Sequence, residues 1–365
     1  MYSKRMSPLR ESNQPLKGRG ALSNPTGRFE RHQRAPVDDG WYQDEVPDFV
    51  PTSIEPDSAR SVITRNDSPD IPFEQSINPY RGCGCGCSYC YARPSHSYVG
   101  LSPGLDFETR LFYKKDGGRL LEEELAKPGY VCKPITLGAN TDPYQPIERR
   151  MRVTRDILEV LARCRHPVTI ITKSVLVLRD LDLLADLARD GLAGVAVSIT
   201  TLDVELKRVM EPQAASPHAR LEAVNRLTVA GVPTGVMVAP VIPALTDHEM
   251  EGILEAAAGA GARWAGYVLL RLPHEVKDLF REWLAAHYPD RADHVMSVVR
   301  QMRGGRDYDS SFGTRMRGTG AFAELLRSRF QVACRRLKLG TGRHQPPNTA
   351  LFRPPGSSPQ LTLDL

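Results

Sequence analysis

Short apolar segments alternate with amphipathic segments from Ser76 onward, and this alternation is the feature that most constrains the fold. The segments expected to form strands are 76–78, 135–138, 168–172, 194–199, 235–239 and 264–270. Between them, apolar residues recur at helical spacing over about 151–164, 177–190, 204–210, 216–230 and 247–260. Such alternation predicts an α/β protein with a mostly parallel sheet and crossover helices. About six βα units are too few for a closed eight-unit barrel, so we expect a partial (β/α)₆ TIM-like barrel with functional residues at the carboxyl ends of its strands.

The composition divides the chain into four parts. Residues 1–70 are rich in Pro, Ser, Gly and charged residues without a sustained period, which predicts a basic, largely extended or disordered N-terminal arm. Residues 71–273 form the expected barrel core. Residues 274–340 are expected to be a helical extension, with helices at about 274–287, 290–303 and 318–338. Residues 341–365 are rich in Pro and Gly and predict an irregular tail.

Hydrophobic residues make up 41% of the chain and charged residues 25%, which is typical of soluble globular proteins. The N-terminus lacks the apolar region of a secretory signal, and no apolar run approaches the roughly 18 residues of a membrane span. We therefore expect a cytoplasmic protein without a membrane partner; the sequence does not indicate an oligomeric state.

The net charge of +5 does not by itself indicate nucleic-acid binding, but the basic residues are unevenly distributed. Only Glu11 and Glu30 offset the basic residues that precede Pro36. These basic residues are Lys4, Arg5, Arg10, Lys17, Arg19, Arg28, Arg31 and Arg34. Such an arm could neutralise phosphates of a nucleic acid, or it could be a solvated tail.

A glycine-punctuated loop carries Cys83, Cys87 and Cys90 at C-x₃-C-x₂-C spacing. Three thiolates this close can hold three irons of a [4Fe–4S] cluster and leave the fourth iron open. An open iron could bind S-adenosylmethionine (SAM) through its amino and carboxylate groups, and an electron from the cluster could then cleave the C–S bond to give a 5′-deoxyadenosyl radical.

Other interpretations of these cysteines remain open. Cys85 could complete a structural zinc site, which needs four closed ligands, or the thiols could be incidental or redox-active. A disulfide scaffold fits poorly, because the chain has 7 Cys, an odd number, and no secretory signal. The remaining three are expected to be small apolar core residues: Cys132, Cys164 and Cys334.

Polar residues follow the expected strands at the edge where a barrel places its active site. The candidates for cofactor binding are Asn140, Thr141, Asp142, Lys173, Ser198, Thr200 and Arg271. The first three could bond to the amino group of SAM or simply end a strand in an Asx-turn. Lys173 could pair with a carboxylate or phosphate, or begin a helix in solvent. Ser198 and Thr200 are plausible donors to the carboxylate or ribose of SAM, and Arg271 could clamp an anion.

The segments 76–83 and 90–94 resemble those of radical SAM proteins related to spore photoproduct lyase, which are often labelled DNA repair photolyase-like. The match is nearest to an uncharacterised bacterial branch and runs from 18–24 to the tail at 351–354 and 360–361. Between these ends, the further segments that resemble the family are 104–109, 141–148, 171–174, 198–201, 211–212, 239–243 and 270–273. The branch usually carries Glu-His where this chain has Gly84-Cys85, which leaves the three ligands intact.

The resemblance implies an enzyme with a [4Fe–4S] cluster on Cys83, Cys87 and Cys90, with Lys173 and Ser198 near the SAM carboxylate. It also implies an electron donor such as flavodoxin or ferredoxin, and a possible nucleic-acid substrate for repair or modification. The lyase uses a cysteine as hydrogen-atom donor, and no cysteine here aligns with it, so thymine-dimer reversal is not carried over and no catalytic residue is assigned. The alternatives are action on a protein or small metabolite, or a non-catalytic iron–sulfur or zinc protein.

Overall fold

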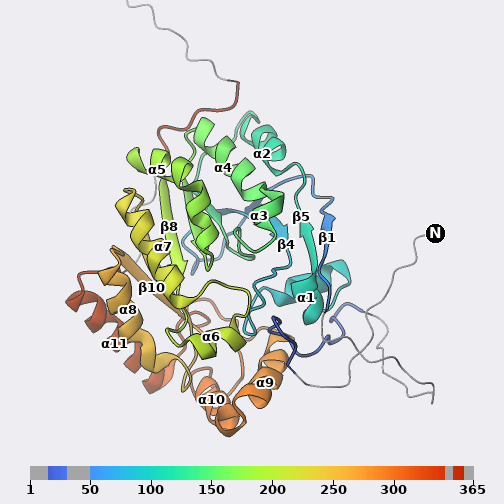
Figure 1. Ribbon diagram of the computed structural model, residues 1–365, viewed down its shortest axis with the longest axis vertical. Coiled ribbons are helices and arrows are strands. Elements are labelled where there is room, and N and C mark those ends of the chain that lie inside the picture. The colour runs from blue at the N-terminus through green and yellow to red at the C-terminus, as the bar shows by residue number, and fades with distance from the viewer. Residues whose placement is uncertain (1–14, 31–49, 342–347, 357–365) are drawn as a thin grey trace, which may run out of the picture.

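The centre of the protein is an open, eight-stranded sheet in the order β11-β10-β9-β8-β7-β6-β3-β2 (Figure 1). The computed structural model describes residues 15–30, 50–341 and 348–356. The strands are β2 (Ile63–Arg65), β3 (Gln75–Ile77), β6 (Ile135–Leu137), β7 (Val168–Thr172), β8 (Ala193–Ser198), β9 (Thr234–Val241), β10 (Trp264–Leu269) and β11 (Gly340–Thr341). Only the β2–β3 pair is antiparallel within this sheet. Because β2 and β11 lie at opposite edges, the sheet is not closed, which confirms the predicted partial-barrel class.

Helices follow the parallel strands as crossover connections. They are α3 (Glu148–Met151), α4 (Val153–Arg163), η2 (Val175–Asp180), α5 (Leu181–Arg189), α6 (Val204–Met210), α7 (Pro217–Val229), η3 (Asp247–Glu249) and α8 (Met250–Gly259). The C-terminal helices are α9 (Val276–His287), α10 (Pro289–Gln301) and α11 (Gly320–Arg336). In the described part of the chain, no helix is both long and apolar enough to cross a bilayer.

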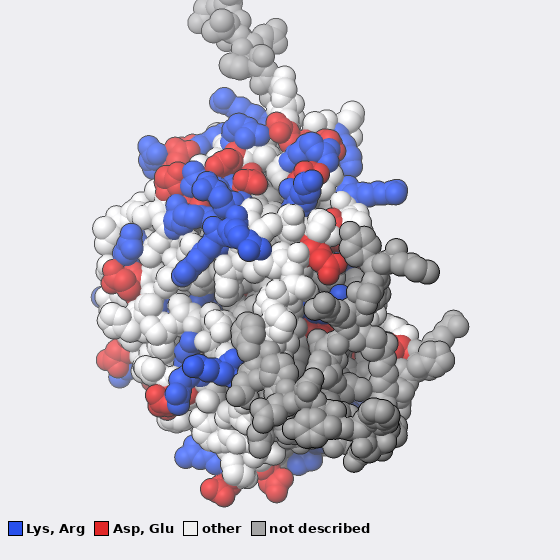
Figure 2. Space-filling view, turned by 45° about the vertical axis from the view of Figure 1, so that its right-hand side comes forward, with Lys and Arg blue, Asp and Glu red and all other residues white. Residues whose placement is uncertain are grey.

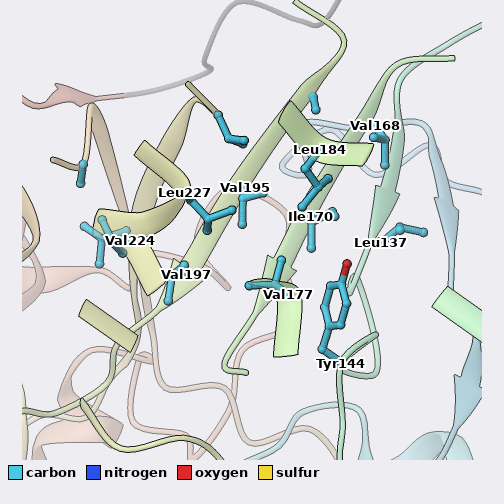
Figure 3. Close-up of a cluster of buried hydrophobic side chains, with 14 of the residues drawn as sticks. Leu137, Tyr144, Val168, Ile170, Val177, Leu184, Val195, Val197, Val224 and Leu227 are labelled. Carbon is cyan, nitrogen blue, oxygen red and sulfur yellow. The ribbon is translucent and has the colours of Figure 1, made fainter. Parts of the chain in front are cut away.

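The main core lies between the sheet and these helices (Figure 3). Leu137, Ile170 and Val195 project from neighbouring strands towards Leu184 and Leu227, and each is at most 1% exposed. Burying one such side chain contributes about 1.5–3 kcal/mol, so this layer holds the strand ends in a defined register. Among the cysteines outside the loop, Cys164 and Cys334 are buried as expected, whereas Cys132 is only partly buried.

Several short elements in the described residues were not predicted. They are β1 (Ser53–Pro56), β4 (Tyr80–Arg81), β5 (Arg110–Tyr113), η1 (Arg93–Val99), α1 (Leu105–Thr109) and α2 (Gly117–Leu125). Three of them form a second sheet in the order β1-β5-β4.

Part of the predicted N-terminal arm packs on the core. Leu16, Ala21 and Leu22 are buried, with 5%, 2% and 2% of their surface exposed. The division into four parts stays a prediction, but residues 15–30 are attached to the same body as the cysteine loop. Basic residues of the arm that lie outside the described residues are Lys4, Arg5, Arg10, Arg31 and Arg34.

Candidate active site

The cysteine loop, residues 82–91, follows the carboxyl end of β3 through the short strand β4 and is held by three other segments. The Cys83 N–H donates to the Phe107 carbonyl at 2.9 Å, and the Gly84 N–H donates to the Gln145 side chain at 2.8 Å. The Ser88 N–H donates to the Met210 carbonyl at 3.0 Å. Gly86 has φ of +68°, a left-handed turn that favours glycine. Hydrogen bonds to three other segments and the left-handed turn at Gly86 therefore define the path of the loop backbone.

The thiols of the loop are free and close enough to interact electrostatically. Cys83, Cys85 and Cys87 are buried, and Cys90 is partly buried. Burial raises the pKa values of Cys87 and Cys90, and a charge on Cys83 raises both further. Cys85 shares a hydrogen bond with Cys83, which, together with burial, raises the Cys85 pKa well above its ordinary value. No three His, Cys, Asp or Glu side chains of the described residues already surround a single metal-sized point.

This donor set nevertheless fits an iron–sulfur cluster. Because burial raises the pKa values of Cys87 and Cys90, these two thiols need a positive group to become thiolates, and iron provides that charge. The hydrogen bond with Cys85 already lowers the pKa of Cys83. Iron–sulfur clusters are bound by cysteine thiolates, and Cys83, Cys87 and Cys90 can supply three of them.

Lys173 lies beside this loop, directly after β7. Its N–H donates to Asp142 Oδ2 at 2.8 Å, and the Thr172 hydroxyl donates to Asp142 Oδ1 at 2.7 Å. The Lys173 ammonium lies 5.8 Å from the centre of the Tyr89 ring. Burial lowers the pKa of Lys173, but the charges of Cys87 and Glu211 outweigh it, and the net effect raises the pKa. The ammonium is a fixed positive charge next to the thiols.

The loop after β6 is tied to the segment that leads into the cysteine loop. Asn78 Oδ1 accepts from the N–H groups of Asn140 and Thr141 at 3.0 and 3.4 Å. The Thr141 hydroxyl donates to the Tyr80 carbonyl at 2.9 Å. The hydroxyl of Thr141 and both carboxylate oxygens of Asp142 therefore have partners within the protein.

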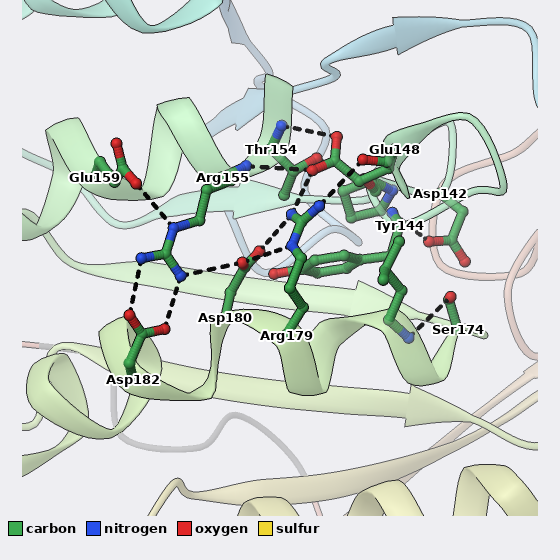
Figure 4. Close-up of polar contacts among 12 residues, drawn as sticks. Asp142, Tyr144, Glu148, Thr154, Arg155, Glu159, Ser174, Arg179, Asp180 and Asp182 are labelled. Atoms are coloured by element: carbon green, nitrogen blue, oxygen red, sulfur yellow. Dashed lines mark hydrogen bonds and ion pairs between the residues drawn. The ribbon is translucent and has the colours of Figure 1, made fainter. Parts of the chain in front are cut away.

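A buried ionic network holds this loop against α4 and η2 (Figure 4). Glu148 is fully buried and accepts from the Thr154 N–H at 3.0 Å and from Arg179 at 2.5 Å. Arg179 also donates to Asp180 at 2.8 Å, while Arg155 bonds Asp182 through two nitrogens. Paired and hydrogen-bonded charges of this kind fix the loop in one arrangement.

A second buried network, centred on Glu211, was not predicted. Tyr89 and Thr200 both donate to Glu211, the latter at 2.8 Å, and Arg220 pairs with its other carboxylate oxygen. Arg220 also donates to the Ser198 carbonyl at 3.0 Å. Burial raises the Glu211 pKa, but Arg220 and Lys173 together lower it to about 2, so the carboxylate stays ionised. This network places Ser198 and Thr200 at the end of β8.

The Glu211 network escaped sequence analysis because its members are far apart in the chain. Glu211 was noted only as part of the segment 211–212. Nothing distinguishes Glu211 and Arg220 in the sequence from solvent-exposed charges.

A third buried pair, Arg93–Glu108, joins the cysteine loop to the N-terminal segment. Both side chains are fully buried. Arg93 donates to the Cys87 carbonyl at 2.8 Å. Glu108 accepts from the N–H groups of Gly20 and Ala21 at 3.0 and 2.8 Å. The N-terminal segment thus contributes to the support of the loop.

Replacing Gly20 with Ala is expected to separate these two segments. A Cβ at Gly20 would overlap the carbonyl oxygen of Gly86, and backbone cannot move away as a flexible side chain can. We expect a loss of about 1–3 kcal/mol in the free energy of unfolding, as in other overpacked sites, together with lower iron content after reconstitution. Denaturant titration and iron analysis measure the two effects. The control is Gly259→Ala, where a Cβ meets no atom within 4 Å; equal behaviour of the two variants would contradict the coupling.

Arg271 completes the site at the end of β10. Its guanidinium carbon lies 4.8 Å from the centre of the Tyr91 ring. The Tyr91 hydroxyl donates to the Ala139 carbonyl. The structure therefore brings the three expected cluster ligands, Lys173 and Arg271 to one edge of the sheet, whereas Thr141, Asp142 and Thr200 use their polar groups within the protein.

The Radical SAM superfamily model matches residues 77–257. An uncharacterized protein of Mycobacterium tuberculosis (strain ATCC 25618 / H37Rv) is 37% identical over 233 residues, which cover 63% of this chain and 68% of that protein. The chain belongs to the radical SAM superfamily. Another uncharacterized relative, from Methanocaldococcus jannaschii, is 29% identical over 218 residues, 59% of this chain and 76% of the relative.

Solved structures of spore photoproduct lyase share the fold of this radical SAM enzyme. The lyase complexed with dinucleoside spore photoproduct has a TM-score of 0.57 at 15% identity, covering 79% of this chain and 80% of the lyase. A lyase mutant with bound AdoMet and the same dinucleoside has a TM-score of 0.56 at 15% identity, with the same coverage. Members of this superfamily use a [4Fe–4S] cluster and SAM, and they need a reductant.

Proposed function

We propose that Cys83, Cys87 and Cys90 hold the cluster of this radical SAM enzyme. The observation that carries the proposal is that these thiols are buried or partly buried, interact with one another and lie beside Lys173 at the carboxyl edge of the parallel sheet. When bound, the cluster supplies the electron that cleaves SAM to methionine and a 5′-deoxyadenosyl radical. Cys85 is not needed as a ligand, because a fourth thiolate would close the site to SAM.

Lys173 is the proposed partner of the SAM carboxylate. Its ammonium lies over the ring of Tyr89 in the cysteine loop, and its pKa is raised, so its charge is retained. Ser198 lies on the adjacent strand, β8. Arg220 donates to the Ser198 carbonyl, so the Ser198 hydroxyl is the group proposed to bind SAM. Four further residues are proposed to shape the SAM site: Asn140, Thr141, Asp142 and Thr200. A flavodoxin or ferredoxin is the proposed reductant.

Nucleic acid is the proposed substrate class. The lyase structures that share the fold include complexes with a dinucleoside. Of the three described basic residues that precede Pro36, two have structural partners: Arg19 donates to the Val50 carbonyl at 2.7 Å, and Arg28 lies 3.9 Å from Glu275. Exposed basic residues on the body are the better candidates for phosphate contacts.

A basic surface formed by Lys115, Arg149, Arg150 and Arg152 meets this need. All four are exposed, and no ion pair links them to another described residue. The segments that carry them meet where α2 packs on α4: a Cβ at Gly117 would lie 3.0 Å from Val153. Figure 2 shows Lys and Arg side chains gathered in the upper half of one face, with Asp and Glu side chains among them. Because α3 follows the loop after β6, this surface lies towards the edge of the sheet that bears the thiols.

The double variant Arg149→Gln/Arg150→Gln is expected to bind single-stranded nucleic acid more weakly and with less salt dependence. Loss of two phosphate contacts should reduce the slope of log affinity against log salt by about 1.4. Fluorescence anisotropy at several salt concentrations measures this slope. The matched control is Arg226→Gln/Arg335→Gln, which removes the same charge from two exposed arginines on α7 and α11. Equal slopes for the two double variants would exclude the basic surface, and no binding by the unmodified protein would favour a protein or metabolite substrate.

A further inference from the structure

The guanidinium of Arg271 has unused hydrogen-bonding capacity. Its Nε is buried without an acceptor, and its terminal nitrogens lie 3.5 Å from the Tyr308 hydroxyl and 3.7 Å from Met316 Sδ. No Asp or Glu among the described residues forms an ion pair with it. A guanidinium offers five N–H donors and a permanent charge, so two long contacts leave most of that capacity free.

Arg271 itself is partly buried, and the fully buried arginines of this region donate to acceptors within the protein. Arg93 and Arg220 each pair with a buried carboxylate and also donate to backbone carbonyls. Arg303, which is 4% exposed, donates to the carbonyls of Thr314 and Leu270, both at 2.8 Å. Because buried donors in proteins nearly always have acceptors, Arg271 stands out as a site that expects a ligand.

Arg271 and Lys173 form two separate positive positions around the cysteine loop. The Arg271 guanidinium lies over the ring of Tyr91, at 4.8 Å, whereas the Lys173 ammonium lies over the ring of Tyr89, at 5.8 Å. These two tyrosines flank Cys90 on either side in the sequence. The strands that carry the two cations, β7 and β10, are separated by β8 and β9. The site therefore has places for two anionic groups.

We propose that Arg271, together with the Tyr308 hydroxyl, binds a phosphate group of the substrate. SAM has one carboxylate, and the proposed function pairs it with Lys173. An anion bound by Arg271 must therefore come from a molecule other than SAM. A guanidinium can hold two oxygens of a phosphodiester at once, and the Tyr308 hydroxyl can donate to the same group. This inference rests on the proposed nucleic-acid substrate and assigns Arg271 to that substrate instead of SAM.

The test measures three ligands on the reconstituted full-length protein. The variants are Arg271→Gln, Arg271→Lys and the control Arg306→Gln, which removes the charge of an exposed arginine in the segment that carries Tyr308. Anisotropy gives the affinity for a fluorescent 12-nucleotide oligothymidylate, and equilibrium dialysis gives the affinity for SAM. Thermal unfolding with inorganic phosphate, against chloride at equal ionic strength, tests the anion site without nucleic acid.

We expect Arg271→Gln to weaken oligothymidylate binding by about tenfold or more, with Arg271→Lys in between and SAM affinity within about twofold of the unmodified protein. Phosphate should raise the Tm of the unmodified protein and of Arg306→Gln, but not that of Arg271→Gln. Weakened SAM binding with unchanged oligonucleotide binding would overturn the assignment, as would equal effects of Arg271→Gln and Arg306→Gln. If the unmodified protein binds no oligonucleotide, the nucleic-acid proposal fails, and the phosphate experiment alone then supports or overturns the anion site.

Discussion

Cys87→Ala is expected to abolish both cluster assembly and the formation of 5′-deoxyadenosine. A [4Fe–4S] cluster with three protein ligands has no spare thiolate, and loss of one leaves two. Cys83→Ala and Cys90→Ala should behave in the same way. Iron and sulfide analysis after anaerobic reconstitution measures the cluster, and chromatography of the reduced reaction with SAM measures 5′-deoxyadenosine.

Cys85→Ala is the matched control, because Cys85 lies in the same loop and is equally buried. It should keep the cluster and the SAM cleavage. Loss of the cluster in this variant, with retention in Cys87→Ala, would mean that the ligand set has been assigned wrongly. Full activity of Cys87→Ala would contradict the proposed ligands outright.

Glu211→Gln is expected to destabilise the protein strongly. Glu211 is fully buried, and its partner Arg220 is 1% exposed, so the substitution leaves a buried arginine without its counter-charge. Breaking a buried ion pair from one side typically costs about 3–5 kcal/mol. Glutamine keeps one acceptor oxygen, but its NH2 group would have to face either Arg220 or Tyr89, and both of these donate to Glu211. Denaturant unfolding of the apoprotein measures the loss of stability.

Glu205→Gln provides the control for this experiment. Glu205 lies on α6 and pairs with Arg208, but both side chains are more than 70% exposed. Exposed ion pairs contribute little, so this variant should unfold nearly as the unmodified protein does. A loss in Glu211→Gln no larger than in Glu205→Gln would show that the Glu211 network does not support the site.

The parallel sheet could be predicted because its strands carry strong local patterns. Val168–Thr172 matches the expected segment, and the other five predicted strands differ from expectation by one or two residues at their ends, whereas β11 was not predicted. Each is a short β-branched run bounded by a turn signal, so local preference and burial agree. The positions of Lys173 and Arg271 followed from this, since a parallel sheet places the residues after its strands at one edge.

The buried polar networks could not be predicted from the sequence. Arg93 and Glu108 are fully buried, yet a single sequence gives charged residues no signal of burial. The packing of Gly20 against the cysteine loop could not be predicted either, because the sequence gives no signal of this contact. Helix α2 was missed because it begins with Gly117 and Gly118, which have poor helix propensity; Gly117 is suited to its place by close packing on Val153.

The most direct test of the central claim is anaerobic reconstitution with iron and sulfide, followed by reduction with dithionite and addition of excess SAM. We expect about four irons and four sulfides per chain, an electron paramagnetic resonance signal that changes on addition of SAM, and formation of 5′-deoxyadenosine. A protein that binds zinc and assembles no cluster would contradict the account. So would a cluster whose signal ignores SAM and that yields no 5′-deoxyadenosine.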